Sequence, residues 1–506
     1  LLKEFEKATV CFEKAIIINP KFAEAYNNLG IVFKELGESK KAIVCYEKAI
    51  AIKPNFADAY FNLGIAFSGF NEYQKAKSCY EKVIKINPKS ADAQNNLGTI
   101  FRILGEHDKS IACYEKSTKL NPSHLYAYSN KLFSTLYIEK IKPEEYLFTA
   151  KKFRSSLKKI TSNLLLENQL EANPKKLRIG FVSGDFKQHP VGYFLLNTLK
   201  YLKNKKLELF AYSNLNKRDE LSNKLKAYFD NWSEISNVDD KNLINQIIKD
   251  KIHILIDLSG HTRKNRLPVF INKPAPIQVS WGGYAASTGI PEIDYLIGDS
   301  IVTPTSEKNH FTEKIYTLNN SWVCFTPPDF NVELDKAPCI KNGFFTFGSF
   351  NNLSKINNEV ISLWSEILLS IPNSKIFLKT KELNNSYLKE KIIENFKKNK
   401  VEEKSLILEG NSPRKNLLSS YNRVDLSLDP FPYSGGATSF ESIWMGVPVL
   451  TKKGSKFVSH VTESINYNTG LSNWTAKNNE EYIKKATNFA NNYNKLAIDR
   501  KILRKN

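Results

Sequence analysis

The chain has 506 residues, of which 42% are hydrophobic, enough for about three globular domains of ordinary size. Its formal net charge is +21, but 63 of its 73 basic residues are Lys and 10 are Arg. Nucleic-acid surfaces favour the bidentate fork of Arg, so this balance argues against nucleic acid as a partner. No uninterrupted apolar stretch reaches about 18 residues, which argues against a membrane span or a membrane partner.

Residues 1–130 repeat a pattern every 34 residues. The positions in register are the Pro-ending pairs 19–20, 53–54, 87–88 and 121–122, the aromatic residues Phe12, Tyr46, Tyr80 and Tyr114, and the glycines Gly30, Gly64 and Gly98. This period is typical of tetratricopeptide repeats, which are helical hairpins stacked into a solenoid. We predict an α-solenoid over 1–130 and, where the period is lost, a helical linker over 131–176. The first repeat is already under way at Leu1, so we expect further sequence before it.

The cysteines follow the same period. Cys11, Cys45, Cys79 and Cys113 are 34 residues apart, and no C-x-x-C pair occurs. We therefore interpret them as core positions of the repeats, and predict no metal site and no disulfide framework. Unpaired thiols fit a reducing compartment, so we expect a cytoplasmic location.

A ladder of asparagines also keeps the 34-residue step: Asn28, Asn62, Asn96 and Asn130. Each falls on the first helix of its predicted pair, the helix that lines the concave groove of such solenoids. A side-chain amide can bind both the N–H and the C=O of a peptide backbone. One interpretation is a groove that holds an extended acceptor polypeptide. The other is that the amides cap or bridge the repeats themselves.

From residue 177, short apolar runs rich in β-formers alternate with helix-like segments. The runs are LRIGFVS, LELFAYS, HILIDLSG, APIQVSW and IDYLIGD, followed by FFTFGSF, SKIFLK, SLILEG, VDLSLDPF and PVLT. Strands separated by helices indicate parallel sheets. We predict two Rossmann-like halves, 177–335 and 336–506, that face one cleft, with ligands beyond the carboxyl ends of the strands.

The segment DPFPYSGGATS, 429–439, lies at such a strand end and precedes a helix. Backbone N–H groups and the helix dipole at a helix start favour an anion. Gly435 and Gly436 let the backbone approach it, and Thr438 and Ser439 add hydroxyl donors. Glu441 is placed to accept hydrogen bonds from a ribose. The alternative is a plain turn with Ser/Thr capping.

Two more strand ends carry candidate groups. FGSFNNLSKI contains Lys355, which can neutralise a diphosphate, and Asn352, which can orient it. The alternative for Lys355 is one surface Lys among 63. SGDFKQHPVGYF contains His189, a side chain suited to proton transfer, held extended by the following proline unless it is only a structural loop residue.

The remaining loops, DLSGHTRKNR and WGGYAASTG, supply His261, Gly283 and Tyr284 as possible active-site residues. Motifs of zinc hydrolases, serine hydrolases and nicotinamide enzymes are absent, as is any Asp-x-Asp pair that would clamp a metal-bound sugar nucleotide. We therefore expect neither a cofactor nor a metal, and a Lys with a helix start to neutralise a leaving diphosphate.

These motifs resemble the protein O-linked N-acetylglucosamine transferases, and more closely their bacterial members and the plant Spindly-type enzymes. The resemblance rests on LRIGFVSGDFKQHPVGYF, HILIDLSGHT, KPAPIQVSWGGYAASTG, SFNNLSKI and DPFPYSGGATSFESIWMGVPVLT, in this order. It implies tetratricopeptide repeats followed by a metal-independent, inverting GT-B glycosyltransferase. Its substrates would be a nucleotide sugar and the Ser or Thr hydroxyls of proteins.

The resemblance also assigns roles. His189 matches the active-site His of the family, and Lys355 matches the Lys that binds the donor diphosphate. Asn352 and Thr438 match phosphate-contacting residues, and Glu441 matches an acidic ribose ligand. The asparagine ladder matches the one that lines the family's acceptor groove.

The chain departs from the animal enzymes at Gly436, where they carry His, and at Ala437, where they carry Thr. The long insert between their two halves is also missing. These departures leave the base-binding pocket open, so GDP-fucose is the alternative to UDP-N-acetylglucosamine as donor. A second alternative is a non-enzymatic repeat scaffold with a degenerate transferase region.

Overall fold

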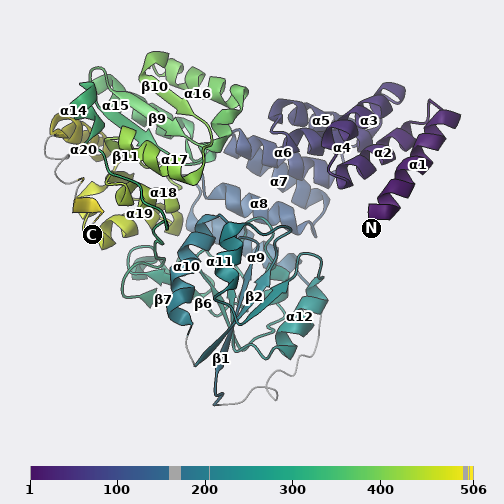
Figure 1. Cartoon of the computed structure of the whole chain (residues 1–506), viewed down its shortest axis with the longest axis horizontal. Helices are drawn as coiled ribbons and strands as arrows, with labels where there is room; N and C mark the ends of the chain where they lie inside the picture. The colour runs from purple at the N-terminus through teal and green to yellow at the C-terminus, as the bar shows by residue number, and fades with distance from the viewer. Residues whose placement is uncertain (1, 159–172, 204–205, 494–499, 501, 505–506) are drawn as a thin grey trace. The chain divides into compact units, whose positions relative to one another are not determined.

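The computed structural model describes residues 2–158, 173–203, 206–493, 500 and 502–504. The chain divides into two compact units, Leu1–Ser134 and Thr135–Asn506. The first unit is helical, and the second contains two sheets with helices around them (Figure 1). The predicted fold class, a helical solenoid followed by a two-sheet α/β region, is confirmed.

The first unit is a succession of helices of similar length. They are α1 (Leu2–Ile18), α2 (Ala23–Glu35), α3 (Ser39–Ile52), α4 (Ala57–Gly69), α5 (Tyr73–Ile86), α6 (Ala91–Ile103), α7 (His107–Leu120) and α8 (Leu125–Thr135). The periodic glycines set the spacing within pairs. A Cβ on Gly30 would lie 2.5 Å from the Tyr46 ring, and one on Gly64 would lie 2.8 Å from the Tyr80 ring. The tyrosine rings are buried, so the glycine allows each helix to close onto the ring of the next.

The interpretation of the periodic cysteines is correct for three of the four. Cys45, Cys79 and Cys113 are buried, but Cys11 is exposed. Cys45 and Cys79 lie on α3 and α5, which are packed between two neighbouring helices, whereas α1 packs mainly against α2. The cysteine position of the repeat is therefore buried only where its helix has a neighbouring helix on each side.

The first sheet of the second unit has seven parallel strands in the order β3-β2-β1-β4-β5-β6-β7. The strands are β1 (Leu177–Ser183), β2 (Leu207–Ser213), β3 (Asn231–Glu234), β4 (Ile254–Asp257), β5 (Ile277–Ser280), β6 (Tyr295–Asp299) and β7 (Lys314–Leu318). The accompanying helices are α9 (Pro143–Ser156), α10 (Pro190–Leu202), α11 (Glu220–Lys226), α12 (Asp240–Lys249), α13 (Leu267–Phe270) and the 3-10 helix η1 (Thr305–His310). We call this the first half.

The second half has six parallel strands in the order β10-β9-β8-β11-β12-β13. They are β8 (Thr346–Ser349), β9 (Lys375–Lys379), β10 (Leu406–Glu409), β11 (Leu426–Leu428), β12 (Val449–Lys452) and β13 (Thr475–Ala476). Its helices are α14 (Pro338–Asn342), α15 (Asn358–Ser370), α16 (Ser386–Lys398), α17 (Arg414–Ser419), α18 (Ala437–Trp444), α19 (Phe457–Asn468) and α20 (Asn479–Asn491). Its 3-10 turns are η2 (Leu353–Lys355), η3 (Lys381–Asn384), η4 (Glu403–Ser405), η5 (Ser420–Arg423) and η6 (Ser472–Trp474).

Both sheets have their central strands buried, because helices cover both faces. The residues of β8, β11 and β12 are all buried, and so are the last five residues of β1 and β2. Such strands read as continuous apolar runs, which is why the sequence predicts them. The loops after β1, β8 and β11 start at the same edge of their sheets, and these loops carry His189, Lys355 and the glycine-rich segment.

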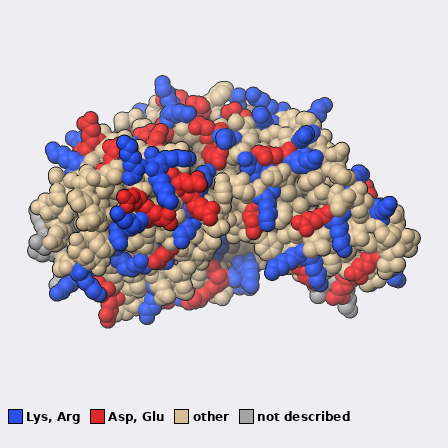
Figure 2. Space-filling model, turned by 90° about the horizontal axis from the view of Figure 1, so that it is seen from above, with Lys and Arg blue, Asp and Glu red and all other residues tan. Residues whose placement is uncertain are grey.

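The charges of the surface are mixed in sign. On the face drawn in Figure 2, Lys and Arg of the described residues alternate with Asp and Glu. Among the residues that the structure describes, no helix is both long and apolar enough to cross a membrane.

Candidate active site

Lys355 lies at the end of η2, just after β8. Its Nζ donates a hydrogen bond to the carbonyl oxygen of Ser434 at 2.7 Å, and it lies 4.4 Å from the centroid of the Tyr433 ring. Burial lowers the pKa of Lys355 to about 8, although the carboxylate of Asp429 acts in the opposite direction. A buried ammonium group favours further negative charge nearby, and a diphosphate would supply it.

The start of α18 and Lys355 both contact the side-chain amide of Asn351. Thr438 Oγ1 donates to Asn351 Oδ1 at 3.1 Å, and Lys355 Nζ reaches the same oxygen at 3.4 Å. Gly436 is the N-cap residue of α18, so no side chain caps this end of the helix. The lysine and the helix start predicted to share an anion are therefore brought together.

Gly435 is held by a buried carboxylate. Its N–H donates to Asp429 Oδ1 at 2.7 Å, and the other oxygen of Asp429 accepts from Thr451 at 2.7 Å. A Cβ on Gly435 would lie 2.1 Å from the hydroxyl of Ser439, so a side chain does not fit there. Burial raises the pKa of Asp429 to about 6, so the carboxylate is charged at neutral pH and opposes the loss of charge from Lys355.

Ser439 and Glu441 already have protein partners. The hydroxyl of Ser439 lies 2.9 Å from that of Thr462 on α19, and Glu441 accepts a hydrogen bond from Arg414 at 2.7 Å. Burial raises the pKa of Glu441, whereas Arg414 lowers it. The predicted contacts of Ser439 and Glu441 with a donor stay predictions. A ribose that contacted Glu441 would therefore contact a carboxylate that is already paired with Arg414.

Asn352 contacts its own turn and a neighbouring loop. Its Oδ1 accepts from the backbone N–H of Ser354 at 2.9 Å, and its Nδ2 donates to Glu382 at 2.6 Å. Asn351, the adjacent residue, joins Lys355 to Thr438. The role predicted for Asn352 stays a prediction, and the geometry adds Asn351 as a candidate.

His189 is the N-cap residue of α10 in the first half. Its backbone is extended, as predicted from the following Pro190, and its Nδ1 accepts from the N–H of Val191 at 3.4 Å. Burial lowers the pKa of His189; Lys381, on η3 of the second half, acts in the same direction and Asp185 in the opposite one. The ring is therefore neutral near pH 7, and its electrostatic environment includes both halves.

The halves are also connected near His189. The guanidinium of Arg414, on α17, lies 4.0 Å from the ring centroid of Tyr193 on α10. Phe194 of α10 packs edge-on against Phe440 of α18, with ring centroids 5.9 Å apart. Through these contacts, the helix capped by His189 lies against the helix that starts the anion site.

The other predicted loop residues have internal contacts. His261 Nε2 lies 2.8 Å from the carbonyl oxygen of Thr288, and burial lowers its pKa to about 4. A Cβ on Gly283 would lie 1.7 Å from a backbone oxygen, and the hydroxyl of Tyr284 lies 2.8 Å from that of Tyr146 on α9. These contacts account for the residues structurally, and their part in a reaction stays a prediction.

The asparagine ladder lies on the predicted helices: Asn28 on α2, Asn62 on α4, Asn96 on α6 and Asn130 on α8. Two further asparagines, Asn27 and Asn95, bridge its members in pairs. Asn62 donates to Asn27 Oδ1 at 3.0 Å, and Asn130 donates to Asn95 Oδ1 at 2.9 Å. The amides thus do bridge repeats, and binding of a polypeptide by their remaining groups stays a prediction.

Sequence reasoning missed Asp429 and Arg414. Asp429 ends the run RVDLSLD directly before the glycine-rich segment. A charged residue at the end of an apolar strand could have indicated a site residue. Arg414 is one of only 10 Arg in a chain with abundant Lys, a second signal. Within the described part of the chain, no group of three His, Cys, Asp or Glu side chains is placed to hold a metal ion.

Family models match most of the chain. The model of glycosyl transferase family 41 matches residues 155–326 and 337–506. Tetratricopeptide repeat models match residues 11–44, 32–69, 57–90 and 91–124.

Similar proteins occur in plants and bacteria. A probable UDP-N-acetylglucosamine–peptide N-acetylglucosaminyltransferase SPINDLY of Petunia hybrida is 35% identical over 339 residues, 65% of this chain and 36% of that protein. The Arabidopsis thaliana protein of the same description is 34% identical over 346 residues, covering 67% and 37%. The chain thus spans little more than a third of these relatives. A mutant O-GlcNAc transferase of Thermobaculum terrenum superposes with a TM-score of 0.85 at 29% identity, over 96% of this chain and 92% of that one.

Proposed function

Because the chain belongs to glycosyl transferase family 41, we propose that it transfers N-acetylglucosamine from UDP-N-acetylglucosamine to Ser or Thr hydroxyls of proteins. The observation that carries the proposal is the convergence of Lys355 and the start of α18 on Asn351. A buried ammonium group and a helix N-terminus together suit a diphosphate.

In the proposed reaction the acceptor hydroxyl attacks the anomeric carbon opposite to the diphosphate. The bond from that carbon to the diphosphate oxygen breaks as the glycosidic bond forms, with inversion. The bonding electrons leave on the diphosphate, and the hydroxyl proton passes to a base or to water. Lys355 and the N–H groups of α18 take up the charge that develops on the diphosphate, so no metal is needed for that step. His189, neutral near pH 7, is the candidate neighbour of the attacking hydroxyl.

The donor and the acceptor are proposed on separate grounds. UDP-N-acetylglucosamine is favoured over GDP-fucose because the similar plant proteins are described as UDP-N-acetylglucosamine transferases. Acceptor polypeptides are proposed to bind the repeats through the asparagine ladder. A cytoplasmic location stays a prediction, supported by six unpaired cysteines.

Isothermal titration of UDP and GDP against the wild type, Lys355→Ala and Lys375→Ala tests the donor site. Lys375 is the matched control, since it lies on β9 of the same half and its Nζ rests over Phe344, 4.5 Å from the ring centroid. We expect UDP to bind the wild type and Lys375→Ala alike, and Lys355→Ala about 10- to 100-fold more weakly because a charged hydrogen-bond donor is lost. Transfer to a protein acceptor should vanish in Lys355→Ala and persist in EDTA.

Other outcomes would assign other functions. Tight binding of GDP instead of UDP would indicate the fucosyl donor. Binding of neither nucleotide would contradict the transferase and favour the scaffold alternative.

A further inference from the structure

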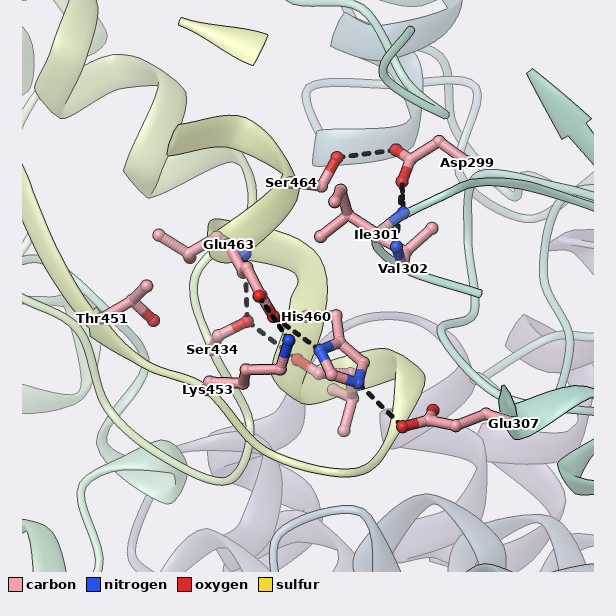
Figure 3. Close-up of polar contacts among 12 residues, drawn as sticks. Asp299, Ile301, Val302, Glu307, Ser434, Thr451, Lys453, His460, Glu463 and Ser464 are labelled. Carbon is pink, nitrogen blue, oxygen red and sulfur yellow. Dashed lines mark hydrogen bonds and ion pairs between the residues drawn. The ribbon is translucent and has the colours of Figure 1, made fainter. Parts of the chain in front are cut away.

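Helix α19 of the second half is attached to the first half along one face. Ser464 Oγ donates to Asp299 Oδ2 at 2.6 Å, and His460 Nε2 lies 3.2 Å from Glu307 Oε1 (Figure 3). The ring of Phe457 packs edge-on against Trp322 of the first half, with ring centroids 4.9 Å apart. Positions 457, 460 and 464 are spaced by three and four residues, so they share one side of the helix.

A second face of α19 holds the glycine loop, which we define as residues 434–436. The hydroxyl of Ser434 donates to the carbonyl oxygen of Val458 at 2.8 Å, and Thr462 Oγ1 donates to the carbonyl oxygen of Gly435 at 3.2 Å. The carbonyl of Ser434 in turn accepts from Lys355 at 2.7 Å. One rigid helix therefore touches both the first half and the loop on which the lysine rests.

His460 is the charged contact of α19 with the first half. Its two ring nitrogens face two carboxylates, Glu463 at 2.7 Å on α19 and Glu307 at 3.2 Å on η1 (Figure 3). Lys453 pairs with Glu463 at 3.0 Å, and His310 lies 3.5 Å from Glu307. A ring that bonds two carboxylates must donate from both nitrogens, which requires the imidazolium form.

The electrostatics agree with this geometry. Burial alone would lower the pKa of His460, but its hydrogen bonds to Glu307 and Glu463 overcome burial and raise the pKa to about 9. Only 2% of its side chain is exposed, so water does not replace these bonds when they are lost.

We propose that His460 is a positioning residue of the donor site, which fixes α19 against the first half and thereby holds the glycine loop under Lys355. This inference rests on the proposed function, because it assigns the loop to the donor. Loss of the imidazolium leaves two carboxylates without their shared cation. Since α19 carries both sets of contacts, a displacement at Glu307 moves the carbonyl of Ser434 away from Lys355.

Three single variants test the inference in the full chain: His460→Gln, Glu307→Gln and His310→Gln. Glu307→Gln is nearly isosteric and changes a residue of the first half that contacts α19 through His460. His310→Gln is the matched control, since His310 also faces Glu307 but belongs to the first half. UDP titration should give Kd values about 2- to 30-fold higher for His460→Gln and Glu307→Gln, the range typical of coupling through a packed element. The donor KM should rise with Kd while the KM of the acceptor stays constant.

The UDP titration distinguishes a loss of positioning, which changes Kd, from a loss of folded protein, which changes the number of binding sites. A variant that only unfolds in part would bind fewer equivalents of UDP at the wild-type Kd. Wild-type Kd values in both His460→Gln and Glu307→Gln, or an equal change in His310→Gln, would overturn the inference.

A second readout does not depend on nucleotide binding. Trace acetylation of lysines, followed by mass spectrometry, reports the reactivity of Lys355. We expect it to rise in His460→Gln and Glu307→Gln and to stay at the wild-type level in His310→Gln. If the wild type binds no nucleotide but Lys355 still responds in this way, the proposed function fails while the positioning role stands. Unchanged reactivity in all three variants would contradict the positioning role itself.

Discussion

Lys355 is a buried cation whose pKa of about 8 makes its charge depend on pH close to neutrality. A bound diphosphate stabilises the ammonium form, so binding must restore the proton wherever the free protein has lost it. UDP affinity should therefore fall as the pH rises through 8, by up to about tenfold per pH unit. Below pH 8 Lys355 is already protonated, so its titration should not change the affinity there. Titration of UDP between pH 7 and 9.5 measures the slope.

The control for this pH dependence is Lys355→Arg. A guanidinium stays protonated throughout this range, so the decline above pH 8 should disappear even if the affinity itself is lower. A wild-type affinity that stays constant to pH 9.5 would show that the charge of Lys355 does not contribute to binding.

The position of a single residue was predictable where it follows directly from the order of strands along the chain. Lys355, Thr438 and His189 follow strands, and residues at the carboxyl ends of parallel strands meet at one edge. Which side chain each would contact was not predictable, because partners come from distant segments. Asn351, the neighbour of the predicted Asn352, contacts both Lys355 and Thr438, and Glu441 pairs with Arg414 across 27 positions. Both contacts are made by the tertiary fold.

The helices of the first unit depend on the glycine at each contact with a tyrosine ring. In α4, a Cβ on Gly64 would lie 2.8 Å from Tyr80, whereas a Cβ on Gly69 meets nothing within 4 Å. Gly64→Ala should therefore destabilise α4 and α5 by about 1–3 kcal/mol through overpacking, partly offset by the higher helix propensity of Ala. Gly69→Ala, in the same helix, should be neutral or stabilising.

Hydrogen exchange of the full chain measures the effect locally. Faster exchange in α4 and α5 of Gly64→Ala, with no acceleration in Gly69→Ala, is the expected result. Equal behaviour of the two variants would mean that the glycine is not needed for helix packing.

Among the elements, the apolar strands were predicted and three edge strands were missed. β3 reads NWSE and β7 reads KIYTL, and none of their residues is fully buried. Both are edge strands of their sheet, and β13 at the edge of the other sheet has two residues. Edge strands form through pairing with a neighbour rather than through burial of their own side chains, so they leave little hydrophobic signal.

For the whole molecule, the repeats and the transferase region should contribute to separate steps. The double variant Asn62→Ala, Asn96→Ala removes two rungs of the ladder and leaves the donor site untouched. We expect the KM for a long protein acceptor to rise about 5- to 50-fold, from the loss of several hydrogen bonds, with an unchanged Kd for UDP. Asn55→Ala, at an exposed turn between repeats, is the control. Equal KM values for the double variant and the control would contradict a role of the ladder in acceptor binding.

The bridges between asparagines do not have the period of the helices. Asn27 and Asn95 accept from Asn62 and Asn130, whereas the equivalent positions in the intervening and last repeats are Phe61 and Ser129. The bridges between asparagines therefore recur only every second repeat, although the contacts between Gly and Tyr recur at all three glycines of the period. A solenoid of this kind can be lengthened or shortened by two repeats with every contact type conserved. A change by a single repeat keeps the core and disrupts the alternation of bridged and unbridged neighbouring repeats.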